Sequence, residues 1–249
     1  MTVQEGVDFT AYAMKYDNHR IADPDIVDVI IDNCKIDESM QILDFGCGTG
    51  NYLQLLQLKG YSNLFGLDQS DDMCKSAYDK TAAIIRRGSH KYIPFHDNFF
   101  DAIIIIDVMH FIDDLSILFH SLKRVSKRSG FVFISTQSHK QLDARIYGKY
   151  FPSAAAIDKL RHHEIDEIVR VAEENGFSLC KIQDYLTNAD FIVDKKYFDL
   201  IQDKAFYILR LLSDKEFNNG IEMLKADMKN GNFTAKFAGR TLITLQARE

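Results

Sequence analysis

Three glycines between a predicted strand and a predicted helix mark the clearest place for chemistry in this sequence. Gly46, Gly48 and Gly50 follow the predicted strand 41–45, and leucines at helical spacing begin soon after Asn51. Because glycine has no side chain, the backbone N–H groups of such a turn can approach a ligand closely. The segment therefore predicts a site for a nucleotide-like ligand at the start of a helix.

The spacing of these glycines argues against two common nucleotide-binding loops. The dinucleotide fingerprint Gly-x-Gly-x-x-Gly requires glycine where this chain has Asn51. The phosphate loop of nucleoside triphosphatases requires Gly-Lys-Ser or Gly-Lys-Thr, and that triplet does not follow here. A nicotinamide oxidoreductase is therefore an outside alternative.

Polar side chains also stand where other predicted strands end. Asp68 follows the run 64–67, Asp107 follows the isoleucine-rich run 102–106, and His110 comes shortly afterwards. Ligands of open α/β sheets bind at the carboxyl ends of the strands, so these side chains should lie near the glycine turn. Imidazole can take a proton near neutral pH, which makes His110 the first candidate for a catalytic residue. Simple packing of His110 against the ligand is the alternative.

Three more histidines lie in the second half of the chain. His139 follows the fifth predicted strand and is a further candidate for the ligand-binding edge of the sheet. His162 and His163 precede a predicted helix, and we interpret them as solvated or capping groups.

Alternating strands and helices must position these residues. Short apolar runs separated by stretches of helical periodicity predict an α/β fold, with a mostly parallel sheet covered by helices on both faces. The seven predicted strands are residues 41–45, 64–67, 82–86, 102–106, 131–134, 178–185 and 241–247. Ser70 is the expected N-cap of a helix over 71–78, and Gly176 is the expected C-terminal cap of another helix.

The last two predicted strands are separated by residues 186–238, which are too many for a hairpin loop. We predict a helical cap there, with one helix over 197–212 and another that begins at a capping box formed by Ser213 and Glu216. Most of its aromatic residues should build the cap's own core, and the others could line an apolar pocket. These residues are Phe191, Tyr197, Phe198, Phe206, Tyr207 and Phe217.

The segment 42–51, Ile-Leu-Asp-Phe-Gly-Cys-Gly-Thr-Gly-Asn, resembles the first motif of class I S-adenosylmethionine-dependent methyltransferases. The resemblance extends along most of the chain and is to the small-molecule type (methyltransferase domain 11/25-like). It implies a Rossmann-like, seven-stranded, mostly parallel sheet within a single domain, 1–249, and S-adenosyl-L-methionine as the cofactor. Residues 1–30 resemble the N-terminal lid helices of such enzymes, and Phe151, Pro152, Ser153 and Arg161 resemble their substrate-side lid.

The resemblance also implies a cofactor site. Asp68 would bind both ribose hydroxyls, Met73 would pack on adenine, and Arg20 would pair with the cofactor carboxylate. Ser89 stands where the family usually has an acidic residue, so the adenine amino group would be bound by backbone atoms or His90. The implied cofactor-binding residues are Tyr16, Arg20, Asp44, Gly46, Cys47, Gly48, Asp68, Gln69, Met73, Ser89, His90, Asp107 and Val108. Helix packing is the alternative role for Tyr16.

The charge and composition of the chain limit the kinds of partner that it is expected to bind. The formal net charge of −6 opposes binding of many phosphates, and no apolar run reaches the length of a membrane helix. The basic cluster Lys123, Arg124, Lys127 and Arg128 is expected at a helix C-terminus, and the scattered cysteines lack metal-ligand spacing. We therefore expect a cytoplasmic monomer or homodimer that methylates a small, partly apolar organic acceptor without a metal, a nucleic acid or a membrane. The alternatives are an RNA or protein methyltransferase, and a noncatalytic cofactor-binding protein.

Overall fold

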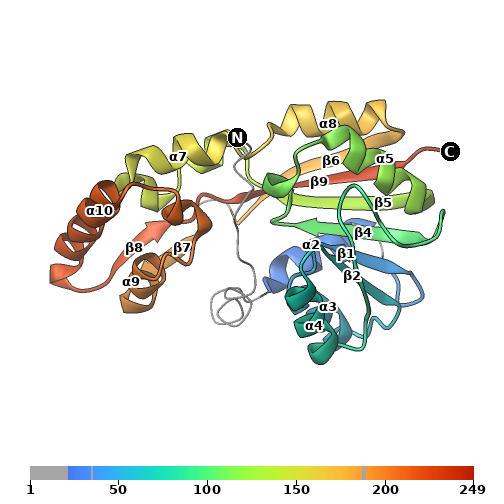
Figure 1. Cartoon of the computed structure of the whole chain (residues 1–249), viewed down its shortest axis with the longest axis horizontal. Coiled ribbons are helices and arrows are strands. Elements are labelled where there is room, and N and C mark those ends of the chain that lie inside the picture. The colour runs from blue at the N-terminus through green and yellow to red at the C-terminus, as the bar shows by residue number, and fades with distance from the viewer. Residues whose placement is uncertain (1–21, 35, 187–188) are drawn as a thin grey trace. The chain divides into compact units, whose positions relative to one another are not determined.

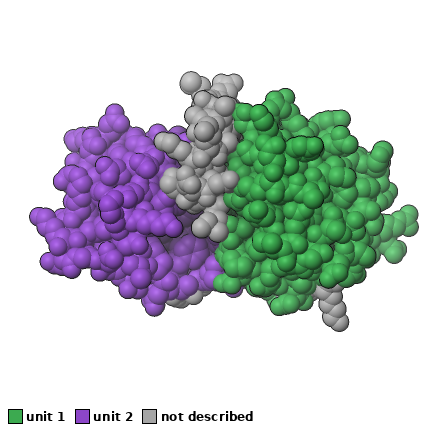
Figure 2. Space-filling view, turned by 90° about the horizontal axis from the view of Figure 1, so that it is seen from below, with its two compact units in different colours: residues 1–136, 166–183, 242–249 green, residues 137–165, 184–241 purple. Residues whose placement is uncertain are grey.

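The computed structural model describes residues 22–34, 36–186 and 189–249, which form two compact units. Figure 1 shows the course of the chain. Unit 1 consists of the described residues up to 136 together with 166–183 and 242–249, and unit 2 consists of residues 137–165 and the described part of 184–241 (Figure 2). No helix among these residues combines the length and the apolar character needed to cross a membrane.

Unit 1 is built on a seven-stranded sheet with the order β3-β2-β1-β4-β5-β9-β6. The pairs that join β3, β2, β1, β4 and β5 are all parallel. The strands are β1 (Ile42–Phe45), β2 (Leu64–Asp68), β3 (Ile84–Arg87), β4 (Phe100–Ile106), β5 (Ser126–Thr136), β6 (Phe177–Tyr185) and β9 (Arg240–Ala247). The predicted fold, a Rossmann-like sheet of seven mostly parallel strands, is confirmed.

Helices cover the two faces of this sheet. Figure 1 shows α3 and α4 on one face and α5 and α8 on the other. The helices of unit 1 are α2 (Pro24–Cys34), α3 (Asn51–Leu58), α4 (Asp71–Lys80), α5 (Leu115–Val125) and α8 (Ile165–Glu174), with a 3-10 turn, η1 (Met109–Phe111). The strand β4 is buried along Ala102–Ile106, as expected for an isoleucine-rich strand covered on both faces.

The strand register aligns the residues that the sequence singles out. In β1, Asp44 is paired with Gly66 of β2 and with Ile104 of β4. Phe45 is paired with Leu67, so the glycine turn after β1 is level with Asp68 at the end of β2. At the start of α4, Ser70 accepts a hydrogen bond from Met73 N over 3.4 Å, which confirms the predicted cap.

Unit 2 contains helices and a small antiparallel sheet. Its helices are α6 (His139–Asp143), α7 (Pro152–Lys159), α9 (Lys195–Gln202) and α10 (Asp214–Asp227), with 3-10 turns η2 (Ile146–Lys149), η3 (Tyr207–Arg210) and η4 (Met228–Asn230). The strands β7 (Asp190–Val193) and β8 (Phe233–Lys236) pair with each other. Neither strand is predicted from the sequence, and residues 137–165 join the insertion 186–238 in the same unit, a grouping that the sequence does not indicate. The interpretation as one domain with a cap stays a prediction.

The helix predicted over 197–212 is two elements. The helix α9 begins after Asp194, whose carboxylate accepts a hydrogen bond from Tyr197 N over 2.9 Å, and it ends at Gln202. Lys204 has φ +51°, a left-handed conformation that interrupts the helical path before η3. The periodicity of apolar residues continues across the break, which is why the sequence pattern alone does not reveal it.

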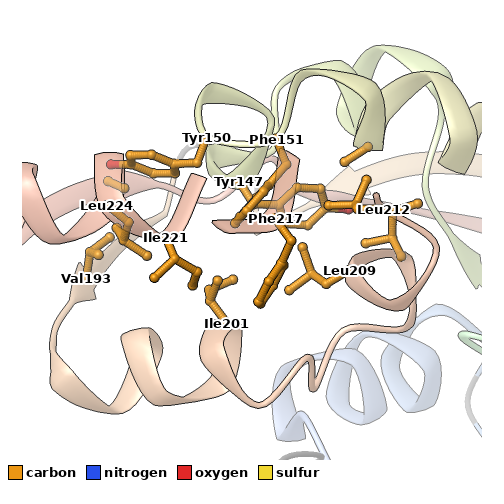
Figure 3. Packing of buried hydrophobic residues seen from close by; sticks show 13 residues of the cluster. Tyr147, Tyr150, Phe151, Val193, Ile201, Leu209, Leu212, Phe217, Ile221 and Leu224 are labelled. Carbon is orange, nitrogen blue, oxygen red and sulfur yellow. The ribbon is translucent and has the colours of Figure 1, made fainter. Parts of the chain in front are cut away.

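The core of unit 2 combines aromatic side chains with aliphatic ones (Figure 3). The rings of Phe151 and Phe217 stack with centroids 5.8 Å apart. Gly220 of α10 lies so close to Phe151 that a Cβ atom there would be 2.2 Å from the ring. Phe191, Tyr197, Phe198 and Phe206 pack around the same cluster. The expectation that most of the aromatic residues build the core of this region is confirmed.

Candidate functional site

The glycine turn is tied to the end of β2. Gly46 N and Cys47 N both donate to the carbonyl oxygen of Leu67, over 2.7 and 3.0 Å. Gly46, Gly48 and Gly50 have φ values of +79°, +53° and +84°, which side chains with a Cβ atom rarely adopt. The three glycines therefore shape a backbone cradle at the carboxyl ends of β1 and β2.

Val108 leaves no room for a side chain at Gly46. A Cβ atom at Gly46 would lie 2.3 Å from Val108 Cγ2. We expect Gly46→Ala to lower the stability of unit 1 by about 2–3 kcal/mol, from left-handed strain of about 1 kcal/mol and overpacking. Urea unfolding measures this loss, and Gly46→Ala combined with Val108→Ala should recover the steric part.

Gly60→Ala is the matched control for the strain. Gly60 has φ +98°, but a Cβ atom there would approach only the end of the flexible Glu38 side chain, at 3.3 Å. This substitution should cost about 1 kcal/mol. Equal losses for Gly46→Ala and Gly60→Ala would contradict the steric argument.

Asp68 is held at the rim of the cradle by backbone donors. Its Oδ2 accepts a hydrogen bond from Gly48 N over 3.0 Å, and its Oδ1 accepts one from Ser70 N over 2.9 Å. Burial raises the pKa of this carboxyl, and the hydrogen bonds from Ser70, Gly48 and Gln69 partly offset that rise. The fixed carboxylate can accept further donors, such as a pair of hydroxyl groups.

Asp44 lies beneath the glycine turn and is almost fully buried, with 2% of its surface exposed. Its Oδ2 has no hydrogen-bond partner. Burial, with a smaller contribution from the negative charge of Asp68, raises the pKa of Asp44 to about 8. A buried carboxyl oxygen without a donor fits a site whose remaining hydrogen bond comes from a ligand.

The apolar side of the cradle is formed by Cys47 and Met73, which are both buried. Burial, together with the charges of Asp44 and Asp68, raises the pKa of the Cys47 thiol well above its ordinary value. Cys47 therefore stays a neutral, unreactive thiol. Gln69, by contrast, has an exposed side chain, and its carbonyl oxygen accepts a hydrogen bond from Arg87 Nε over 3.2 Å.

The loop after β3 forms a tight turn in which Ser89 and Tyr92 exchange backbone hydrogen bonds of 2.9 and 3.0 Å. His90 Nε2 lies 2.6 Å from Asp113 Oδ1, and Lys91 Nζ lies 2.9 Å from Asp113 Oδ2. Hydrogen bonds from Lys91 and His90 lower the pKa of Asp113. Asp113 is not predicted from the sequence, because its partners lie more than 20 residues earlier and no local pattern joins them.

The end of β4 carries Asp107, Val108 and His110. Asp107 has φ +58° and donates its N–H to Ser135 O over 3.2 Å. His110 lies in η1, and its ring centroid is 4.1 Å from that of Phe111. The left-handed Asp107 turns the chain sharply, so that Val108 packs on Gly46. Tyr16 and Arg20 lie outside the described residues.

Histidines of unit 2 have internal partners. His139 Nδ1 lies 2.6 Å from Glu164 Oε1, and its Nε2 lies 2.8 Å from His162 O. His162 is 9% exposed, and its Nδ1 is 2.9 Å from Asp158 O. His162 is therefore buried and not solvated, and its contact with a carbonyl oxygen in the last turn of α7 agrees with the alternative, a capping group.

Comparison with known proteins identifies the domain that carries this cradle. A family model described as a methyltransferase domain matches residues 43–134, from β1 into β5. A solved candidate methyltransferase of an antibiotic biosynthesis pathway from Anabaena variabilis superposes with a TM-score of 0.74 at 20% identity, over 90% of this chain and 98% of that chain. Residues 43–134 thus match a methyltransferase domain, and the fold is that of solved methyltransferases. An S-adenosylmethionine-dependent methyltransferase of Methanosarcina mazei is among the solved chains with this fold, and the family match agrees with the predicted methyltransferase domain.

Two relatives of the methyltransferase domain have named reactions. A malonyl-[acyl-carrier protein] O-methyltransferase of Hamiltonella defensa is 31% identical over 96 residues, which cover 38% of this chain and 37% of the relative. A tRNA (carboxymethyluridine(34)-5-O)-methyltransferase of Arabidopsis thaliana is 32% identical over 117 residues, covering 46% of this chain and 28% of the relative. The chain thus spans about a third of the length of these two relatives.

The residues of the methyltransferase domain fit S-adenosylmethionine. The left-handed glycines let the turn after β1 pack closely against Val108, and Asp68 offers a fixed carboxylate to ribose hydroxyls. The unpartnered Oδ2 of Asp44 offers an acceptor to a cationic ligand. The structure brings the predicted residues 44, 46–48, 68, 73, 107 and 108 to one end of the sheet. The cofactor-binding roles of all the predicted residues, with Gln69, Ser89 and His90 among them, stay predictions.

Proposed function

We propose that this protein transfers a methyl group from S-adenosylmethionine to a small, partly apolar organic acceptor. The observation that carries the proposal is the carboxylate of Asp68, fixed by Gly48 N and Ser70 N beside the glycine turn of a methyltransferase domain. Such an arrangement suits a ribose with two neighbouring hydroxyl groups.

The bound cofactor supplies a methyl group on a positively charged sulfur. The chain binds and orients: Asp68 holds the ribose, Met73 packs on the base, and the left-handed Gly46 keeps the turn after β1 tight against Val108. His110, after β4, is our proposed base that takes a proton from the acceptor when the acceptor must lose one.

Charge favours a small acceptor over a nucleic acid. Arg124, within the basic cluster, donates to Asp97 and to the carbonyl oxygens of Ile93 and Phe95 at 2.6–2.8 Å. Lys127 pairs with Asp101 at 2.7 Å. These cations are engaged inside unit 1, and the chain as a whole carries −6 charges. Pairing of these two cations reduces the positive charge that the cluster offers to phosphates.

Turnover tests the proposal directly. The full chain is incubated with S-adenosylmethionine and a panel of small carboxylic acids, amines, phenols and thiols, and S-adenosylhomocysteine is measured. We expect release of S-adenosylhomocysteine with at least one class. Tight binding of the cofactor without turnover on any acceptor would instead support the noncatalytic alternative.

A macromolecular acceptor is the second candidate, favoured by the similarity to the tRNA methyltransferase of Arabidopsis thaliana. An RNA substrate would be bound largely through its phosphates, so affinity for total tRNA should fall steeply between 50 and 200 mM salt, by roughly a thousandfold or more. Under our first proposal, tRNA shows no such binding and small acceptors are methylated.

We expect His110→Asn to lower kcat about a hundredfold for an acceptor that loses its proton during transfer, because a positioned base contributes at least this factor. The limb of the pH profile that reports the base should disappear. The affinity for S-adenosylhomocysteine should remain within a few-fold. His120→Asn, an exposed histidine on α5, is the control and should change neither quantity. An unchanged kcat in His110→Asn would assign His110 to packing alone.

A further inference from the structure

Two carboxyl groups lie close together under the glycine turn, and one of them is incompletely satisfied. Both oxygens of Asp68 accept backbone hydrogen bonds, whereas Oδ2 of Asp44 is buried without a donor. An ionised carboxylate in such a place loses its hydration at Oδ2 and gains no hydrogen bond there in return. Protonation removes this cost, so the proton on Asp44 substitutes for a missing partner.

The groups around Asp44 increase this tendency. The neighbours in the adjacent strands are Gly66 of β2 and Ile104 of β4, which carry no charge. Asp68 contributes a negative charge from the end of β2, and Cys47 contributes a neutral thiol from the turn. Cys74 of α4, whose pKa is raised to about 11, is also neutral. Within the described chain, no positive group acts on Asp44 to hold its carboxylate form.

We propose that Asp44 is protonated when the cofactor site holds no ligand, and that a cationic cofactor displaces this proton to solvent as it binds. This inference rests on the proposed function, because it requires S-adenosylmethionine or its demethylated product to bind in the cradle. The carboxylate left by the proton then balances the positive charge of the ligand. Cofactor binding is therefore coupled to the release of one proton.

The sign of the pH dependence follows from this coupling. Below the pKa of Asp44 in the ligand-free protein, near 8, each decrease of one pH unit lowers the binding constant of the cofactor by up to tenfold, because one proton must be displaced. Affinity for the cofactor should therefore fall as the pH drops from 8 towards 6. Above about pH 8 the carboxyl is already ionised, and the coupling disappears.

Calorimetry in two buffers with different ionisation enthalpies, such as phosphate and Tris, counts the protons exchanged. At pH 7 we expect the full chain to release between half and one proton per S-adenosylhomocysteine bound. Asp44→Asn keeps the shape of the side chain but cannot ionise. In this variant the number of protons released per ligand should be lower than in the wild type by the same half to one proton. Methylthioadenosine, which has the nucleoside but no ammonium or sulfonium group, should bind without releasing a proton from Asp44.

Asp97→Asn is the matched control, because Asp97 is a carboxylate of the same unit that is 66% exposed and pairs with Arg124. It should release as many protons as the wild type. Equal proton counts in the wild type and Asp44→Asn would overturn the inference while leaving the proposed function intact. No heat with either cofactor would overturn both.

The wild type alone supplies a second measurement, in case Asp44→Asn does not fold. Its proton count should decline from pH 7 to pH 8.5, with a midpoint near 8, after subtraction of the ligand's own amine titration. A count that does not change over this range would also overturn the inference.

Discussion

Asp68→Ala should weaken the binding of S-adenosylmethionine and S-adenosylhomocysteine by at least a hundredfold. A hydrogen bond to a charged group contributes about 1.5–3 kcal/mol, and the carboxylate is proposed to accept two of them from the ribose. The substitution also leaves Gly48 N and Ser70 N without their acceptors, so the glycine turn loses part of its support. Calorimetry with the product cofactor measures the loss.

Asp71→Ala is the control for this measurement. Asp71 is three residues further along, at the start of α4, and its 72% exposed carboxylate pairs with Arg87 at 3.0 Å. Its removal should change the affinity by less than a few-fold. Asp68→Asn keeps one acceptor oxygen, so its affinity for the cofactor should lie between the affinities of Asp68→Ala and Asp71→Ala. Wild-type affinity in a folded Asp68→Ala protein would remove the basis of the proposed function.

The strands of unit 1 and the contents of the cradle could be predicted because their signals are local. A buried parallel strand is a short apolar run, and β1, β2 and β4 each end where a glycine or an aspartate interrupts that run. Ser70 caps α4 through its own neighbour Met73. Parallel pairing then aligns the strand ends, so the meeting of the glycine turn with Asp68 follows from the fold class.

Features that depend on distant partners could not be predicted. Glu216 has the spacing of a capping box with Ser213, and Ser213 does accept a hydrogen bond from Glu216 N. The carboxylate of Glu216, however, accepts hydrogen bonds from Ser153 N and Ser153 Oγ at 2.9 and 2.6 Å. Ser153, 63 positions earlier in the chain, therefore competes for the carboxylate of Glu216, and the spacing of Ser213 and Glu216 gives no sign of this competitor.

The short strands β7 and β8 were missed for a related reason. Each has four residues, and they pair across more than thirty intervening residues that include α9 and α10. The burial of β7 is nearly limited to Val193, so no alternation of apolar and polar residues marks the strand. The two strands come together only because the intervening helices α9 and α10 fold the chain back on itself, and the sequence of either strand does not show this.

The largest loss of stability is expected from Asp158→Ala in unit 2. Asp158 is 2% exposed, and its Oδ2 lies 2.6 Å from Arg145 and accepts the hydroxyl of Tyr147 over 2.7 Å. Arg161 is 3.6 Å from Oδ1, and burial lowers the pKa of its guanidinium. Removing the carboxylate leaves two partly buried cations without their anion. Breaking such a pair costs about 3–5 kcal/mol.

Amide hydrogen exchange in α7 and α10 measures this loss within unit 2, and Asp143→Ala is its control. Asp143 is 57% exposed and pairs with Lys159 at 2.7 Å, so its removal should cost less than about 1 kcal/mol. Arg145→Met combined with Asp158→Leu removes one cation together with the anion and should recover part of the stability, because apolar replacements of buried pairs are often tolerated. Equal protection in Asp158→Ala and Asp143→Ala would mean that Asp158 only fills space. In that case Arg145 would have to be stabilised by its other partners, Gln137 and Tyr147, although both side chains are uncharged at neutral pH.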